Sequence, residues 1–182
     1  MKVTPGPFSG LLVIEPSVFG DSRGFFMELW SEGRYRDAGL EAGFVQDNLS
    51  LSARGTLRGL HFQNPRPQGK LVTVLEGEVY DVVADLRRGS STFGRTFGLP
   101  PPPENKVQFY VPPGFAHGFV VVSDRALFHY KVTSPYSPAD EVTVRWDDPD
   151  LGIDWPVDAP LLSARDAAAP RLRDLNPDKL FA

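Results

Sequence analysis

The chain has 182 residues, enough for one domain with a sizeable buried core and short extensions at its ends. It contains no cysteine, which excludes disulfides, thiol nucleophiles and thiolate metal ligands. Its net charge of −4 argues against a nucleic acid polymer as partner, although a few arginines in one cleft still suffice to bind a small anion. We expect a cytoplasmic protein with no membrane partner, because no segment approaches the apolar length of a spanning helix and the first residues lack the apolar run of a secretory signal.

Ten short segments predict β-strands, because they are rich in β-branched and aromatic residues and are bounded by Gly, Pro, Ser or Asp. Their spacing of about ten residues is typical of a sandwich or barrel, and a jelly roll is the natural choice. We therefore expect a single mainly β domain over 1–182. The ten segments are 8–14, 25–30, 44–50, 57–63, 70–77, 78–86, 107–112, 118–123, 126–133 and 141–146.

Two short helices and one stiff loop complete the prediction. The first helix lies within 31–40, where Ser31 is a plausible cap and Gly39 a plausible end. The second opens a short C-terminal helical segment from about Ser163, and Pro170 ends it. The proline-rich run over 99–105 predicts a loop between strands.

The strand expected over 78–86 carries two aspartates on one face. Alternate residues of a strand share a face, so Asp81 and Asp85 lie with Val83, opposite Val82 and Ala84. Burying a carboxylate on such a face costs free energy unless the face is solvated, the carboxylate has a bonding partner, or the face serves a function.

The chain has three histidines, and two of them lie in motifs. His117 belongs to PPGFAHGF, which matches the PxGxxH pattern of the second cupin motif, where a Pro–Gly turn aims the histidine into the barrel mouth. His61 lies in GLHFQ, where metal-binding cupins carry HxH, but Gln63 replaces the second histidine. A divalent metal in such a barrel needs several histidines and a carboxylate, so we expect no metal here. His129 lies in an apolar strand without a motif, and we expect it to be structural.

Further motifs carry a closer resemblance. They are DSRGFFMELW, FVQDNLSLSARGTLRGLHFQ, QGKLVTVLEGEVYDVVADLRRGS, PPGFAHGF, YKVTSPYSP with Glu141, WDDPDLGIDWP and LSARDAAAP. In this order, from about Phe8 to Asp174, the chain resembles the dTDP-4-dehydrorhamnose 3,5-epimerases, which are metal-free cupins. The resemblance implies a cupin-type double-stranded β-helix and a cofactor-free isomerase acting on a dTDP-sugar. It also implies a homodimer whose N-terminal strands cross to the partner subunit.

The implied reaction needs three kinds of group. A 4-keto-6-deoxyhexose has acidic hydrogens at C3 and C5, and inverting either carbon requires a base, a group that stabilises charge on O4, and an acid on the opposite face. His61 has the right ordinary pKa for the base, and the resemblance makes Asp166 the group that orients it. Lys70 is placed to stabilise the enolate, and Tyr130 resembles the family's acid. The structural alternatives are a helix-start carboxylate for Asp166, a solvated strand opening for Lys70 and a half-buried aromatic for Tyr130.

The resemblance also implies a set of binding residues. Arg23 and Arg58 match the arginines that bind the diphosphate, for which planar guanidinium groups are well suited. Tyr136 lies in a turn and is expected to line the sugar or the nucleotide. Arg165 stands where the family commonly has Lys, which keeps the charge but changes the shape. The remaining matched positions are Phe26, Glu28, Gln46, Asn48, His117 and Glu141.

One geometric conflict concerns Arg58 and His61. Residues three apart on a regular strand point to opposite faces, yet both are expected to reach one ligand. A bulge at Gly59, a place for Arg58 at the strand mouth, or nucleotide contacts from the other subunit would each remove the conflict.

Rival functions stay open at this stage. An epimerase that acts at C3 alone would keep the same His, Asp and Lys, and Tyr130 favours the double reaction without deciding it. A cupin that binds a sugar nucleotide without turnover would be expected to lack the base, its partner or the acid. A metal-dependent oxygenase is disfavoured by the ligand count. Whether the product feeds rhamnose or another deoxysugar is not decided by the sequence.

Overall fold

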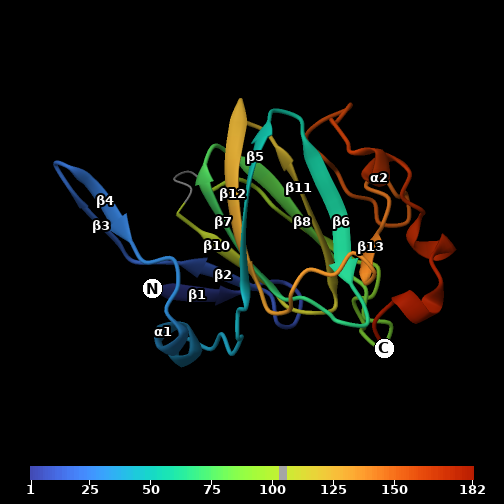
Figure 1. Ribbon diagram of the computed structural model, residues 1–182, viewed down its shortest axis with the longest axis horizontal. Helices are drawn as coiled ribbons and strands as arrows, with labels where there is room; N and C mark the ends of the chain where they lie inside the picture. Colours follow the sequence, from blue (N-terminus) through green and yellow to red (C-terminus); the bar gives the residue numbers. More distant parts are fainter. Residues whose placement is uncertain (103–105) are drawn as a thin grey trace.

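The computed structural model describes residues 1–102 and 106–182, so the predicted loop over 99–105 falls partly outside the described residues. Two antiparallel sheets face each other and a separate hairpin extends from them (Figure 1). The strands are β1 (Lys2–Pro5), β2 (Leu12–Glu15), β3 (Val18–Asp21), β4 (Gly24–Met27), β5 (Gln46–Ala53), β6 (Leu57–Gln63), β7 (Lys70–Glu76), β8 (Val79–Asp85), β9 (Thr96–Leu99), β10 (Gln108–Val111), β11 (Phe115–Val121), β12 (Arg125–Val132) and β13 (Glu141–Thr143).

The larger sheet has the order β1-β2-β10-β7-β12-β5, and the smaller has the order β13-β6-β11-β8-β9. This arrangement confirms the predicted mainly β jelly roll. Each predicted strand overlaps an observed one, and the segment over 57–63 matches β6 at both ends. The sequence reading missed β1, β3 and β9, which are four residues long and contain Pro or Gly. The strand predicted over 141–146 is shorter in the structure, where β13 ends at Thr143.

Both predicted helices are present but shorter than expected. Helix α1 (Glu32–Asp37) follows Ser31, and helix α2 (Ala164–Ala167) follows Ser163, whose side chain accepts a hydrogen bond from the backbone of Asp166. Two single 3₁₀ turns, η1 (Leu172–Asp174) and η2 (Pro177–Lys179), continue the C-terminal segment. No helix among the described residues is long and apolar enough to cross a membrane.

Three apolar clusters hold the layers together. The first fills the space between the sheets, where Val72 and Phe128 of the larger sheet meet Val83 and Phe119 of the smaller one. In the second cluster, the outer face of the smaller sheet packs against the C-terminal stretch that includes Trp155, Leu172 and Leu180. In the third, α1 and its flanking residues cover part of the larger sheet through Trp30, Tyr35, Leu40 and Phe44. The sheets are thereby fixed as two opposing walls.

The two aspartates of β8 do share a face, and both are paired. Asp81 bonds to His117, while the carboxylate of Asp85 accepts hydrogen bonds from Arg87 and Thr92. Burial raises the pKa of Asp85, but these hydrogen bonds outweigh it and bring the pKa to about 2. Asp85 therefore organises the turn after β8, whereas Asp81 lies against a histidine of the motif PPGFAHGF.

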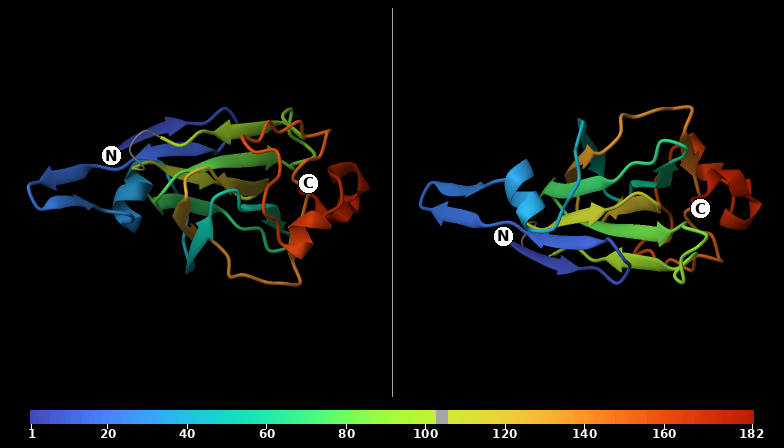
Figure 2. Two further views of the ribbon diagram at one scale, coloured as in Figure 1. Left: turned by 90° about the horizontal axis from the view of Figure 1, so that it is seen from above. Right: turned by 90° about the horizontal axis from the view of Figure 1, so that it is seen from below.

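The hairpin of β3 and β4 extends from the body at the end opposite the C-terminal segment (Figure 2). It presents large apolar side chains to solvent, and Phe26 is 68% exposed. Phe19 packs against Phe26 of the same hairpin, at a ring-centroid distance of 6.5 Å. The rings of Phe19, Phe25 and Phe26 are each more than 60% exposed.

Candidate active site

A bulge at Gly59 brings Arg58 and His61 to one cavity. Opposite β6, His117 pairs with His61 and Phe119 pairs with Arg58, so three steps along β6 match two along β11. Gly59 has a φ of +132°, and a Cβ there would lie 2.5 Å from the Cα of Gly118. Only glycine fits this crossing. The bulge at Gly59, one of the three expected ways to remove the conflict between Arg58 and His61, is present.

The cavity lies between the two sheets and has a volume of about 500 Å³, within the range typical of small-molecule sites. His61 and His117 reach it from the smaller sheet, while Lys70 and Tyr130 reach it from the larger one. It therefore has polar groups on two opposing walls. The predicted site residues that line it are Asn48, Arg58, His61, Lys70, His117 and Tyr130.

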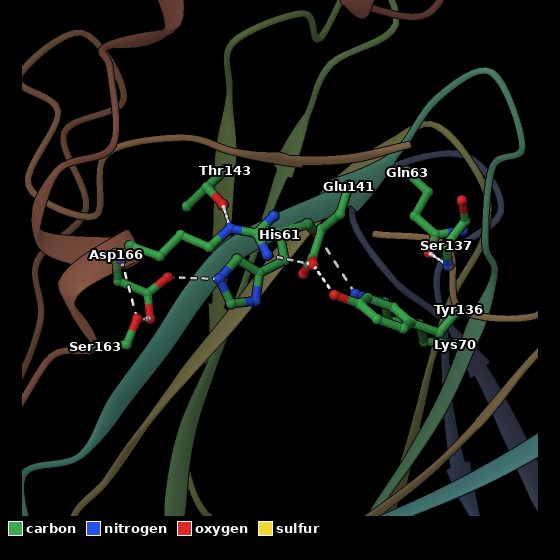
Figure 3. A network of polar contacts seen from close by, with 10 residues as sticks. His61, Gln63, Lys70, Tyr136, Ser137, Glu141, Thr143, Ser163 and Asp166 are labelled. Carbon is green, nitrogen blue, oxygen red and sulfur yellow. Dashed lines mark hydrogen bonds and ion pairs between the residues drawn. The ribbon is translucent and has the colours of Figure 1, made fainter. Parts of the chain in front are cut away.

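His61 and Asp166 form a hydrogen-bonded dyad (Figure 3). The Nε2 of His61 lies 2.5 Å from Oδ1 of Asp166, and the other carboxylate oxygen accepts a 2.8 Å hydrogen bond from Ser163. Asp166 is buried, which raises its pKa, but the hydrogen bonds and charge of His61 and the bond from Ser163 outweigh burial and lower the pKa overall. The carboxylate is thus ionised and fixed, and it holds the imidazole in one orientation.

Burial lowers the pKa of Lys70 and raises the pKa of Tyr130, and in both cases it favours the neutral form. Burial lowers the pKa of Lys70 to about 8, while the negative charges of Glu141 and Asp81 act the other way. Its Nζ lies 3.4 Å from the backbone oxygen of His61. Burial and the nearby Glu141 raise the pKa of Tyr130, against a smaller effect of Arg58. At neutral pH the site therefore holds an ammonium group and a protonated phenol.

A second network lies beside the dyad and includes Tyr136 and Glu141 (Figure 3). The guanidinium of Arg165 donates to Oγ1 of Thr143 at 3.0 Å and to the carboxylate of Glu141. Glu141 also accepts a 2.6 Å hydrogen bond from the hydroxyl of Tyr136, whose backbone N–H donates to Gln46 at 3.0 Å. The contact of Arg165 is thus with β13, and the half-exposed ring of Tyr136 is tied to the same carboxylate.

Three predicted residues lie on the hairpin or just after it, outside the cavity of their own chain. Arg23 lies on the hairpin and bonds to Asp21, with Nη2 2.5 Å from Oδ2. Phe26 is exposed on β4, and Glu28 forms an ion pair with Arg34 of α1. Their separation from the cavity agrees with the alternative in which such contacts come from another subunit.

Sequence reasoning missed two residues of the site. Asp81 bonds to His117 at 2.7 Å, and the signal available was the shared face of Asp81 and Asp85. Ser163 was expected as a helix cap, but its hydroxyl also donates to the side chain of Asp166. Among residues 1–102 and 106–182 there is no group of three or more His, Cys, Asp or Glu placed to hold a metal ion. The metal-free site stays a prediction that metal analysis of the purified protein would check.

The comparisons with known proteins decide the family. The model of the family described as dTDP-4-dehydrorhamnose 3,5-epimerase matches residues 5–174. The chain belongs to this family. A dTDP-4-dehydrorhamnose 3,5-epimerase from Pseudomonas aeruginosa is 52% identical over 168 residues, which cover 91% of this chain and 93% of that protein.

Solved structures agree with this assignment. The dTDP-6-deoxy-D-glucose-3,5-epimerase from Legionella pneumophila, in complex with dTDP-4-keto-L-rhamnose, is 47% identical with a TM-score of 0.95, covering 99% of this chain and 97% of that chain. A 3'-monoepimerase from Streptomyces bikiniensis, in complex with dTDP-quinovose, is 39% identical with a TM-score of 0.86, covering 93% and 87% of the two chains. The fold is therefore shared by enzymes that differ in the number of centres they invert.

Proposed function

We propose that this protein inverts C3 and C5 of a dTDP-4-keto-6-deoxyhexose, converting dTDP-4-dehydro-6-deoxyglucose to dTDP-4-dehydrorhamnose. The observation that carries the proposal is the position of a His–Asp dyad and a phenol on opposite sheets around one cavity that also holds a buried ammonium group. Inversion at carbon requires proton removal from one face and proton return from the other, and this arrangement has a candidate for each step.

In the proposed reaction, neutral His61 removes the proton from C3 or C5, and the electrons of the broken C–H bond form an enolate with its charge on O4. Lys70 stabilises that charge as it develops, in a site where burial strengthens electrostatic interactions. Asp166 stabilises the imidazolium of His61. Tyr130 donates its proton to the opposite face, and proton exchange with solvent returns His61 and Tyr130 to their starting states.

Binding of the nucleotide part is proposed for the residues around the cavity. Arg58 supplies a guanidinium for the diphosphate, and its Nε and Nη2 are each held 3.1 Å from Oγ of Ser52. Tyr136 presents a half-exposed ring suited to stacking on a base, and Glu141 and Arg165 hold that ring in place. The further contacts proposed from the family pattern are Gln46, Asn48 and His117.

A homodimer completes the proposal. Arg23, Phe26 and Glu28 match binding positions of the family but do not line the cavity of their own chain. They lie on or just after an extended hairpin with exposed aromatic side chains. We infer that this hairpin crosses to a second copy and adds these residues to its site. The cytoplasmic location expected from the sequence stays a prediction.

Deuterium incorporation tests the reaction. The ketosugar nucleotide is incubated with the protein in deuterated water, and the product is analysed by NMR at C3 and C5. We expect deuterium at both carbons and the L-rhamno configuration. Deuterium at C3 alone would identify a C3 epimerase, and no incorporation would favour a binding protein.

A further inference from the structure

The motif histidine His117 belongs to a second His–carboxylate pair that the reaction above does not use. Its Nε2 lies 2.7 Å from Oδ1 of Asp81, and both side chains are more than nine-tenths buried. His117 stands directly opposite His61 in the pairing of β11 with β6. The pair therefore belongs to the same sheet as His61, and His117 reaches the cavity beside it.

Asp81 is bonded through only one of its oxygens. Its Oδ2 is buried and has no hydrogen-bond partner among the described residues. The surrounding side chains include Val72, Val79 and Phe109, which offer no donor. A buried carboxylate with an unpaired oxygen costs free energy, and a neutral acceptor would serve His117 as well. The fold alone gives no reason for the negative charge.

Lys70 gives that reason. Lys70 lines the same cavity as His117, and its Nζ lies 3.4 Å from the backbone oxygen of His61, the residue that pairs with His117. The negative charges of Glu141 and Asp81 raise the pKa of Lys70 against the effect of burial. Glu141 already accepts hydrogen bonds from Arg165 and Tyr136, so its negative charge also acts on these two groups and not on Lys70 alone. Asp81 has no Lys or Arg partner among the described ion pairs. The ionisable groups that face Lys70 are Glu141 on β13, Asp81 on β8, Arg58 and His61 on β6, His117 on β11, Tyr130 on β12 and Asp47 on β5.

We propose that Asp81 is a positioning residue that fixes the imidazole of His117 and supplies a buried negative charge to the Lys70 ammonium. Without this charge, desolvation would remove the proton from Lys70 within the working pH range. Lys70 would then lose the positive charge that the developing O4 enolate needs. The role of Asp81 is electrostatic and acts through Lys70, without contact with the reacting carbons.

The variant Asp81→Asn separates charge from shape, because an amide oxygen still accepts from His117. Lys70 is titrated by NMR in the free enzyme with ¹³C-labelled lysine, and the signal is assigned by its loss in Lys70→Met. We expect the titration midpoint to fall by about one pH unit in Asp81→Asn. The alkaline limb of the kcat profile should move equally, so that kcat relative to wild type is about fivefold lower at pH 8 and nearly unchanged at pH 6.

The matched control is Asp148→Asn, which neutralises a buried carboxylate that bonds to the backbone of Leu172 and does not line the cavity. It should move neither the Lys70 midpoint nor the alkaline limb. Thermal unfolding of Asp81→Asn shows that the variant folds before its pH profile is compared with that of wild type. If that variant does not fold, Asp81→Ser removes the same charge.

An unchanged Lys70 midpoint in the charge-free variant, or an equal loss of kcat at both pH values, would overturn the proposal. The kinetic measurement rests on the proposed epimerase function, whereas the Lys70 titration does not. Failure of the wild type to turn over the ketosugar would contradict the function, and the titration would still decide the role of Asp81.

Discussion

Asp166 shows how one buried side chain can set the reactivity of another. It bonds to His61 at 2.5 Å and is itself held by Ser163. Asp166→Asn keeps the size of the side chain but loses the charge that stabilises an imidazolium. We expect kcat to fall by roughly 10²–10⁴-fold, while dTDP binding measured by calorimetry stays close to wild type.

Ser163→Ala is the matched control for that experiment. It removes one hydrogen bond to Asp166 and the helix cap but leaves the carboxylate in place, so its loss of kcat should be far smaller. If Asp166→Asn retained full turnover, the carboxylate would have only a structural role at the start of α2.

In the proposed reaction, Lys70 combines a catalytic benefit with a cost in stability. Burial lowers its pKa from 10.5 to about 8, so below pH 8 the folded protein holds a poorly solvated ammonium group. We expect Lys70→Met to lower kcat by about 10²–10³-fold and to raise the melting temperature near neutral pH.

The sign of the pH dependence follows from the same shift. Between pH 8 and 10.5 the unfolded chain binds a proton at Lys70 that the folded protein has lost, so wild-type stability rises relative to Lys70→Met as pH increases through that window. Denaturant unfolding of both proteins at pH 7 and pH 10 measures this. A stability difference that is the same at both pH values would show that Lys70 is not desolvated.

At the scale of elements, β6 carries the geometry of the site through one glycine. Gly59 has a φ of +132° and a Cβ there would meet the backbone of Gly118. Gly59→Ala is expected to destabilise the fold by about 2–4 kcal/mol and to abolish turnover, since His61 and Arg58 would no longer share one cavity. Gly24→Ala has the same φ of +132° with nothing within 4 Å of the added Cβ, so it should cost only about 1 kcal/mol. Equal costs in denaturant unfolding would show that the close approach to β11 is unimportant.

The same element shows how far the sequence can predict this protein. The apolar pattern of LRGLHFQ predicts the bounds of β6 correctly, and the conflict between Arg58 and His61 indicated a bulge as one of three solutions. The pairing of Asp81 with His117 was beyond prediction, because it depends on the register of β8 against β11, which no local pattern encodes. Strands β1, β3 and β9 were missed because four residues with Pro or Gly have little strand signal of their own, and neighbouring strands determine their conformation.

At the scale of the whole molecule, the chain places its proposed binding residues in two separate regions. His61 lies in the cavity between the sheets, whereas Arg23 lies on the hairpin that extends away from them (Figure 1). A site that draws on both regions requires either a large movement of the hairpin or a second copy. The hairpin's exposed aromatic rings favour the second copy, because large apolar side chains gathered on one projecting element are typical of an interface.

Subunit complementation separates these two possibilities. Arg23→Ala and His61→Asn are each expected to be nearly inactive. When the two variants are co-expressed, a mixed dimer with exchanged hairpins contains one site that has both His61 and the partner's intact hairpin. Random pairing should therefore restore about a quarter of the wild-type activity per chain. If each hairpin contributed to the site of its own chain, every site would contain one of the two substitutions, and co-expression would restore no activity. Arg54→Ala in place of Arg23→Ala is the control, because Arg54 pairs with Asp124 at the surface and should give an active protein without complementation.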